Sequence, residues 1–127
     1  MEEPGQPMDD IHMPSDVLIV EDNFIIALDT EMVLQDLGVT RVRTVSSVAA
    51  ALAAINERAP DFALIDIDLG GESGFDVGNL LAERKIPFAF ATGYAELISP
   101  PPALANVQIL AKPYSADMLR AVLQSLR

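Results

Sequence analysis

Acidic, hydroxyl and amino side chains stand directly after apolar runs of this sequence, where they could together form a site for a metal ion. Glu21 and Asp22 follow the first run, and Asp66 follows a later one. Thr92 and Lys112 stand at the ends of two further runs. If these runs are parallel strands of one sheet, their carboxyl ends lie at one edge, which is where such sheets bind ligands.

The carboxylates of this group would repel one another and therefore need a compensating charge. Each pair at a separation of about 4 Å costs roughly 4 kcal/mol at an effective dielectric constant of about 20. A divalent cation, a proton or a lysine could supply the compensation. Because the group offers oxygen ligands and neither histidine nor cysteine, the favoured cation is Mg²⁺, which prefers carboxylates together with a phosphate and water.

The composition limits the classes of protein to which the chain can belong. Its 127 residues are enough for one domain, and the net charge of −11 disfavours binding to nucleic acid or to an anionic membrane. The absence of cysteine excludes disulfides and thiolate metal sites. No apolar stretch approaches the roughly 20 residues of a spanning helix, and the acidic, proline-rich amino terminus is unlike a signal peptide. We therefore expect a cytoplasmic protein.

Strands and helices alternate along the chain after an amino-terminal segment with few apolar residues. Residues 1–15 are predicted to form a flexible acidic tail, and residues 16–127 a single domain. Apolar or β-branched runs predict strands, and apolar residues at helical spacing predict helices. The predicted strands are 17–20, 39–45, 62–65, 87–91 and 107–110, and the predicted helices are 25–37, 48–55, 73–81 and 118–126. This order predicts a doubly wound α/β domain with a five-stranded parallel sheet.

Local signals indicate where two helices begin and where one connection is irregular. Ser46 or Ser47 could cap the second helix. Ser73 and Asp76 have the spacing of a capping box that would open the third helix. The consecutive prolines at 100–102 cannot continue a helix that starts after the fourth strand. We therefore expect the fourth helix of the domain to be short or irregular.

Four segments, VLIVEDN, ALIDIDLGGESG, FATG and LAKPY, resemble the receiver domain of bacterial response regulators, a CheY-like domain. They occur in the order expected for that family, and each closes an apolar run. The resemblance extends over residues 16–127 and implies a flavodoxin-like sheet with the strand order 2-1-3-4-5. It also implies that a sensor histidine kinase is the partner and transfers a phosphoryl group to Asp66 in the presence of Mg²⁺.

The resemblance implies a role for each acidic residue of the group. Asp66 matches the phosphoacceptor, a carboxylate nucleophile of the kind that also forms aspartyl phosphates in ATPases. Asp22, Asp66 and the backbone carbonyl of Asp68 would coordinate Mg²⁺. Glu21 would complete the metal site by orienting a water bound to the ion. The acyl phosphate formed on Asp66 is labile, so water can remove it and the modification acts as a timer.

Two residues of the later motifs match the groups that contact the phosphoryl group in that family. Thr92 would hydrogen-bond the phosphoryl group. Lys112 would pair with Asp66 or with its phosphate, and its peptide bond to Pro113 would be cis, a conformation largely confined to proline. Phosphoryl transfer depends mainly on positioning and on charge stabilisation, which these groups would provide.

The sequence departs from the usual family pattern at the residue that transmits the signal. Many receivers have tyrosine or phenylalanine three residues before the lysine, where this chain has Ile109. Tyr94 and Tyr114 are the nearby aromatic residues, and we predict that they form a switch or partner surface together with Ile109. The run at residues 87–94 resembles the "FAT GUY" subgroup, which is linked to HWE-type histidine kinases. We hypothesise that activation acts on the irregular segment at residues 94–106.

The resemblance implies a signalling protein that assists only its own phosphorylation and dephosphorylation. We expect a stand-alone response regulator, since the last predicted helix ends the chain. It would signal by contact with an unknown downstream protein or act as a phosphate sink, as a monomer or as a phosphorylation-dependent dimer. Two alternatives remain: a haloacid-dehalogenase-type phosphatase with Asp66 and Asp68 in its DxD motif, and a pseudo-receiver that binds a partner without phosphorylation.

Overall fold

The centre of the structure is a parallel sheet whose strand order agrees with the prediction. The computed structural model describes residues 13–126 apart from the side chain of Glu96, so most of the predicted tail lies outside the described residues. The sheet has the order β2-β1-β3-β6-β7, and every pair of neighbours is parallel. Its strands are β1 (Asp16–Val20), β2 (Arg41–Val45), β3 (Phe62–Asp66), β6 (Phe88–Thr92) and β7 (Ile109–Ala111). The predicted flavodoxin-like, five-stranded α/β fold is therefore confirmed.

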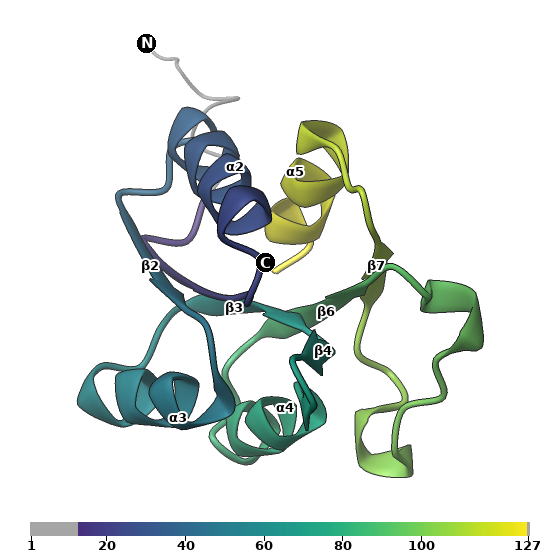
Figure 1. Cartoon of the computed structure of the whole chain (residues 1–127). Coiled ribbons are helices and arrows are strands. Elements are labelled where there is room, and N and C mark those ends of the chain that lie inside the picture. Colours follow the sequence, from purple (N-terminus) through teal and green to yellow (C-terminus); the bar gives the residue numbers. More distant parts are fainter. Residues whose placement is uncertain (1–12, 127) are drawn as a thin grey trace, which may run out of the picture.

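Helices cover both faces of the sheet, which explains the continuous apolar runs of the central strands (Figure 1). On one face lie α2 (Phe24–Asp36) and α5 (Ala116–Gln124), and on the other α3 (Val48–Glu57) and α4 (Phe75–Glu83). Within β1, Leu18 and Val20 join the core cluster beneath α3 and α4, whereas Val17 and Ile19 join the cluster beneath α2 and α5. Within the described residues, no helix is long and apolar enough to cross a membrane.

Side-chain caps begin three of these helices, and the fourth differs from the prediction. Ser47 accepts a hydrogen bond from Ala50 N and caps α3, as predicted. The predicted capping box of Ser73 and Asp76 is wrong, because α4 begins after Gly74. Ser73 Oγ instead accepts a hydrogen bond from Phe75 N at 3.1 Å. The side chain therefore stabilises the turn that precedes the helix.

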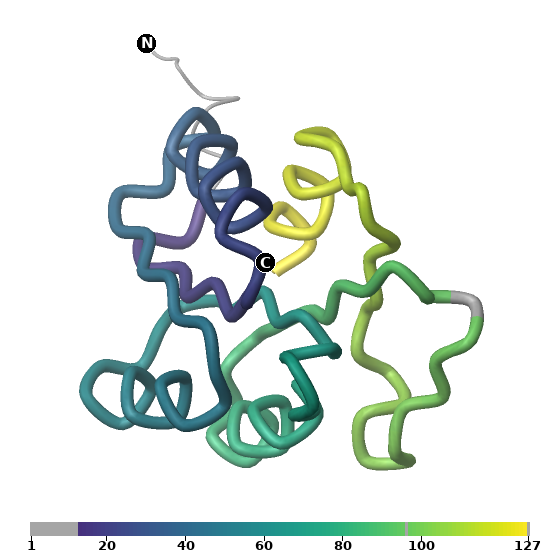
Figure 2. The backbone as a smooth tube through the Cα atoms, in the orientation of Figure 1, coloured from purple at the N-terminus to yellow at the C-terminus, as the bar shows by residue number. Residues whose placement is uncertain are grey.

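The connection between β6 and β7 follows an irregular path (Figure 2). It contains two short 3₁₀ turns in place of a regular helix, as predicted from its prolines. These turns are η1 (Ala95–Leu97) and η2 (Pro102–Leu104). Leu104 is completely buried in the core beneath α3 and α4, so the second turn is anchored to the domain. Leu97 in the first turn is 80% exposed. The half of the connection nearest to β6 therefore has the weaker attachment.

A small hairpin follows β3 and had no counterpart among the predicted elements. Its strands are β4 (Asp68–Leu69) and β5 (Glu72–Ser73), which pair antiparallel. Gly70 and Gly71 form the turn with φ angles of 58° and 94°. Two consecutive positive φ angles are typical of the tight turn that joins hairpin strands, and glycine adopts them without a steric cost.

Candidate functional site

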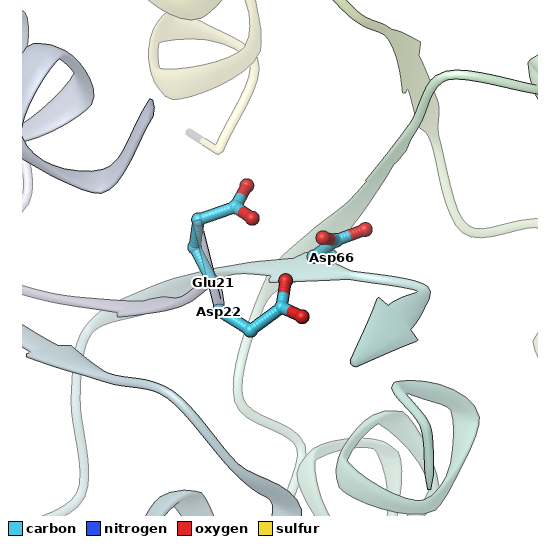
Figure 3. A group of neighbouring side chains, drawn as sticks. All are labelled: Glu21, Asp22 and Asp66. Carbon is cyan, nitrogen blue, oxygen red and sulfur yellow. The ribbon is translucent and has the colours of Figure 1, made fainter. Parts of the chain in front are cut away.

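The parallel pairing of β1 with β3 brings three acidic side chains to one edge of the sheet. Val20 pairs with Ile65, so the next residues, Glu21 and Asp66, are neighbours across the two strands. One carboxylate oxygen from each of Glu21, Asp22 and Asp66 lies within 4.8 Å of the other two (Figure 3). Glu21 and Asp66 are buried, whereas Asp22 is exposed. The group therefore has an inner wall and one side that is open to solvent.

Lys112 reaches this group from the end of β7. Its Nζ lies 2.7 Å from Glu21 Oε1 and 3.0 Å from Asp66 Oδ2. The backbone holds the side chain in place, because Lys112 N donates a hydrogen bond to Thr92 O on the neighbouring strand. The peptide bond between Lys112 and Pro113 is cis, as the resemblance implied. The ammonium group therefore faces two buried carboxylates.

Burial and charge pairing shift the pKa values of Glu21 and Lys112. Burial raises the pKa of Glu21; hydrogen bonds from Lys112 and from Asn23 N lower it, and Asp66 raises it again, so the net pKa is raised. Burial lowers the pKa of Lys112, but the hydrogen bonds to Glu21 and Asp66 outweigh burial and the net pKa is raised. Lys112 is therefore protonated at neutral pH and compensates part of the carboxylate charge.

Both carboxylate oxygens of Asp66 have a donor of their own. Oδ2 accepts from the ammonium group of Lys112 at 3.0 Å. Oδ1 accepts from the backbone N–H of Asp68, also at 3.0 Å. These two contacts, one to each oxygen, hold the carboxylate in one orientation. The side chain of Asp68 is exposed, and the residue begins β4.

The donor set of the group fits Mg²⁺. Its ligand atoms are carboxylate oxygens, which are the ligands that this hard cation prefers. One ammonium group faces three carboxylates, so the group retains an excess of negative charge that a divalent cation would neutralise. Asp22 and Asp66 are in a position to hold the ion, and Glu21 lies beside them but is paired with Lys112. The predicted carbonyl ligand of Asp68 remains a prediction.

The remaining predicted residues lie around the pocket formed by the acidic group and Lys112, and they are buried to different extents. Thr92 is buried at the end of β6, and its Oγ1 accepts a hydrogen bond from Tyr94 N at 3.1 Å. Tyr94 itself is 62% exposed. Ile109 is half-buried on β7 and packs against the core beneath α3 and α4. The structure thus links Thr92 to the start of the irregular connection through a single hydrogen bond.

Tyr114 packs between the pocket and the core beneath α2 and α5. Its hydroxyl lies 2.7 Å from Thr30 Oγ1 on α2 and forms a hydrogen bond with it. Burial raises the pKa of Tyr114. This environment is that of a packing residue, whereas Tyr94 is the tyrosine exposed at the surface. The assignment of both tyrosines to a switch or partner surface remains a prediction.

Gly74 permits the close packing beside Asp66, and Gly70 lies beside Asp22; neither role was predicted from the sequence. A β-carbon at Gly74 would lie 2.3 Å from the backbone oxygen of Asp66, which is far inside van der Waals contact. A β-carbon at Gly70 would lie 3.4 Å from Asp22 Oδ2. Both glycines belong to the segment ALIDIDLGGESG, whose three glycines were a signal that the backbone comes close to the acidic group.

Comparison with known proteins agrees with this geometry. Residues 17–124 match the model of the response regulator receiver domain family. The chain is 34% identical over 122 residues to the phyllosphere-induced regulator PhyR of Methylorubrum extorquens, with 87% of this chain and 43% of PhyR covered. The chain spans less than half the length of the curated relatives that it matches.

Solved structures share the fold over nearly the same region. SdrG from Sphingomonas melonis is 38% identical, with a TM-score of 0.76 and with 88% of this chain and 95% of SdrG covered. A CheY-like receiver domain from Methylobacillus flagellatus is 28% identical, with a TM-score of 0.76 and with 89% of this chain and 98% of that domain covered. Both structures are similar to this chain over almost their whole length.

Proposed function

This chain belongs to the response regulator receiver domain family, and from that premise we propose that it accepts a phosphoryl group from a histidine kinase on Asp66. One observation carries the proposal above the others. Asp66 is buried, its two oxygens are held by Lys112 and by the backbone of Asp68, and two further carboxylates lie within 4.8 Å. An aspartate with a purely structural role would have its charge balanced by neighbouring cations. Asp66 is instead held in one orientation within a group whose three carboxylates face a single ammonium group.

The proposed transfer is a substitution at phosphorus. A carboxylate oxygen of Asp66 attacks the phosphorus atom of a phosphohistidine, the new P–O bond forms, and the P–N bond to the imidazole breaks. The imidazole leaves with the electron pair of the broken bond and is protonated from solvent. Water later hydrolyses the acyl phosphate and restores the carboxylate. The chain then acts as a signalling protein that assists only its own phosphorylation and dephosphorylation.

The residues around Asp66 stabilise the charge that this transfer brings into the pocket. Lys112 Nζ already contacts Asp66 Oδ2 and can turn to an oxygen of the phosphoryl group. Thr92 lies at the same edge of the sheet, where its hydroxyl can donate to a second oxygen. Mg²⁺ held by Asp22, Asp66 and the Asp68 carbonyl would neutralise negative charge on the transferred group.

An apolar stripe on α2 supports a kinase as the partner. Phe24, Ile25, Leu28 and Met32 are between 46% and 76% exposed and follow one another along this helix. Beside the stripe, a pocket of about 430 Å³ is lined by residues of α2 and by Lys112, Pro113 and Tyr114. A phosphodonor must approach Asp66 at this end of the sheet, so the stripe is the surface on which a kinase helix would pack. The run at residues 87–94 favours a kinase of the HWE type.

The connection between β6 and β7 is the proposed switch. Phosphorylation would draw the hydroxyl of Thr92 toward Asp66 and weaken the hydrogen bond that Tyr94 N donates to it. Ile109 stands where many receivers have a mobile aromatic ring, so the signal would pass to residues 94–106 instead. Comparison of amide NMR spectra with and without beryllofluoride and Mg²⁺ tests this step. Unchanged shifts across residues 94–106 would contradict it.

The output of the switch is proposed to be a contact with a downstream protein or the withdrawal of phosphate from a shared kinase. We propose that the receiver works in the cytoplasm, either as a monomer or as a dimer that forms on phosphorylation. The haloacid-dehalogenase alternative has little support, because that family carries its nucleophile on the first strand and here Asp66 ends β3. A pseudo-receiver remains as the outcome of a negative phosphorylation experiment.

Incubation with acetyl phosphate and Mg²⁺, followed by intact mass spectrometry, tests the proposal. We expect one phosphoryl adduct on the wild-type protein, none on Asp66→Asn, and an adduct on the control variant Asp76→Asn, whose carboxylate lies outside the acidic group. Steady hydrolysis of phosphate esters would support the phosphatase alternative. No adduct on the wild-type protein, from acetyl phosphate or from phosphorylated kinase, would support the pseudo-receiver.

The kinase surface is tested separately with Ile25→Ser. Because Ile25 is 76% exposed, the substitution should leave folding unchanged. We expect transfer from a phosphorylated histidine kinase to slow by about tenfold, the loss of roughly 1.4 kcal/mol of contact energy. Phosphorylation by acetyl phosphate should be unaffected, since a small donor needs no protein contact. Equal rates with the kinase would show that the stripe is not its docking surface.

A further inference from the structure

The β4–β5 hairpin connects the acidic pocket with the first turn of α3. On one side its turn lies beside Asp22, since a β-carbon at Gly70 would be in ordinary van der Waals contact with Asp22 Oδ2, at 3.4 Å. On the other side Glu72 Oε1 accepts a hydrogen bond from Val48 N at 3.2 Å. Val48 is the first residue of α3, which packs on the sheet face next to α4. The hairpin is therefore held between the metal-binding edge and a helix that belongs to the core.

The contact made by Glu72 is chemically favourable and specific. The N–H groups of the first helical turn have no partner within the helix, and the amino-terminal end of a helix favours negative charge. Ser47 caps α3 by accepting from Ala50 N, which leaves Val48 N free for an acceptor from outside the helix. Glu72 supplies that acceptor from β5, 24 residues further along the chain. This carboxylate thus connects two segments that are distant in sequence.

The base of the hairpin is fixed by other contacts, whereas its two turn residues are exposed. Gly74 N donates to Ile67 O at 2.8 Å, and Leu69 is buried in the core. The turn consists of Gly70 and Gly71, both exposed, and glycine loses more conformational freedom on ordering than any other residue. Glu72, which accepts the hydrogen bond from Val48 N, is the residue directly after this turn. This hydrogen bond is the contact best placed to keep the turn against Asp22.

We propose that Glu72 is a positioning residue for the metal pocket: by binding the first turn of α3 it holds the Gly70–Gly71 turn against Asp22 and keeps β4, which begins at Asp68, beside Asp66. This inference rests on the proposed function, since it concerns the ion that phosphorylation requires. Loss of the contact leaves the turn free to sample other conformations, and the pocket must then be ordered when Mg²⁺ binds. The apparent association constant for Mg²⁺ is then the intrinsic constant multiplied by the fraction of molecules in which the pocket is already ordered.

The expected effect is a change in Mg²⁺ affinity without loss of the fold. Glu72 is exposed, so Glu72→Ala creates no cavity and should fold normally. We expect its dissociation constant for Mg²⁺ to rise by about tenfold, at the lower end of the range for residues that orient metal ligands. Glu72→Gln keeps an oxygen that can accept from Val48 N and should bind Mg²⁺ nearly as tightly as the wild-type protein.

The experiment is a titration of ¹⁵N-labelled protein with MgCl₂, followed by amide NMR shifts. A matched control, Asp76→Ala, removes another exposed carboxylate from the adjoining first turn of α4 and should leave the affinity nearly unchanged. Amide exchange in metal-free buffer gives a second measurement. Exchange at Gly70, Gly71 and Glu72 should become faster in Glu72→Ala, and should stay close to the wild-type rate in Glu72→Gln.

The outcomes separate this inference from the proposed function. If the wild-type protein binds Mg²⁺ with shifts at Asp22 and Asp66, and Glu72→Ala binds it equally well, the positioning role of Glu72 is overturned and the proposed function stands. Equal weakening in Glu72→Ala, Glu72→Gln and Asp76→Ala would show a general charge effect and would also overturn it. If the wild-type protein binds no Mg²⁺, both proposals fail together.

Discussion

Replacing Asp22 with asparagine should stabilise the metal-free protein and at the same time abolish most of its stabilisation by Mg²⁺. Asp22 is the exposed member of a group whose carboxylate oxygens lie within 4.8 Å of one another. Lys112 Nζ is paired with the other two members, Glu21 and Asp66. Asparagine has nearly the same shape as aspartate but lacks its charge, so the substitution isolates the electrostatic cost of this side chain.

The size of the effect follows from the separation of the charges. At 4.8 Å, the upper limit of the separation of these oxygens, two unit charges repel by about 3.5 kcal/mol at an effective dielectric constant of about 20, and by about 0.9 kcal/mol in bulk water. Because Asp22 is exposed, screening keeps each of its two repulsions near the lower figure, and attraction by Lys112 offsets part of the sum. We expect a gain of about 1 kcal/mol in the free energy of unfolding, which raises Tm by about 4 °C.

Mg²⁺ should reverse this order of stability. An ion that binds only the folded state at ten times its Kd stabilises that state by about 1.4 kcal/mol. The wild-type protein should gain this amount, whereas the variant has lost a charged ligand and should gain little. The variant is therefore expected to be the more stable protein in EDTA, and the wild-type protein should equal or exceed it in Mg²⁺.

Thermal and urea unfolding followed by circular dichroism, in EDTA and in MgCl₂, measure these differences. Asp76→Asn serves as the control, because it removes a carboxylate outside the acidic group and should show the same response to Mg²⁺ as the wild-type protein. The electrostatic account would be refuted if Asp22→Asn were less stable than the wild-type protein in EDTA. Equal stabilisation of both proteins by Mg²⁺ would refute the assignment of Asp22 as a ligand.

Three further substitutions test other contacts of the site. Lys112→Met leaves two buried carboxylates without their cation and should lower the free energy of unfolding in EDTA by about 3 kcal/mol, with part of the loss restored by Mg²⁺. Tyr114→Phe removes the hydroxyl bound to Thr30 and should cost about 1 kcal/mol in urea unfolding, with phosphorylation by acetyl phosphate retained. Gly74→Ala places a methyl group 2.3 Å from the backbone oxygen of Asp66; it should cost about 3 kcal/mol in the same assay and slow phosphorylation.

Much of the fold was predictable because its signals are local. The apolar runs that became β1 and β3 contain no alternation, which indicates strands buried on both faces. The prolines at 100–102 excluded a regular helix, and two 3₁₀ turns were found there. The polar residues at the strand ends were likewise visible in the sequence. Parallel strands place their carboxyl ends at one edge, so Glu21, Asp22 and Asp66 were expected to meet there.

Other features could not be predicted because they depend on contacts between distant segments. Ser73 has the spacing of a helix cap, but α4 begins after Gly74, whose backbone lies close to that of Asp66. The β4–β5 hairpin has strands of only two residues each, which is too short for any periodic pattern to indicate. The acceptor for Val48 N is a glutamate 24 residues away, and no local motif specifies that pair.

The sequence by itself determined the class of the fold, the edge at which chemistry could occur and the residue types available there, because strand and helix periods and strand-end residues are properties of the chain. Only the tertiary structure decided how those groups are paired. Lys112 contacts both Glu21 and Asp66, and Thr92 binds the backbone of Tyr94. Packing also decided which side of the largely apolar helix α2 remains exposed. Charge pairing and exposure depend on distances in space, which a linear pattern does not contain.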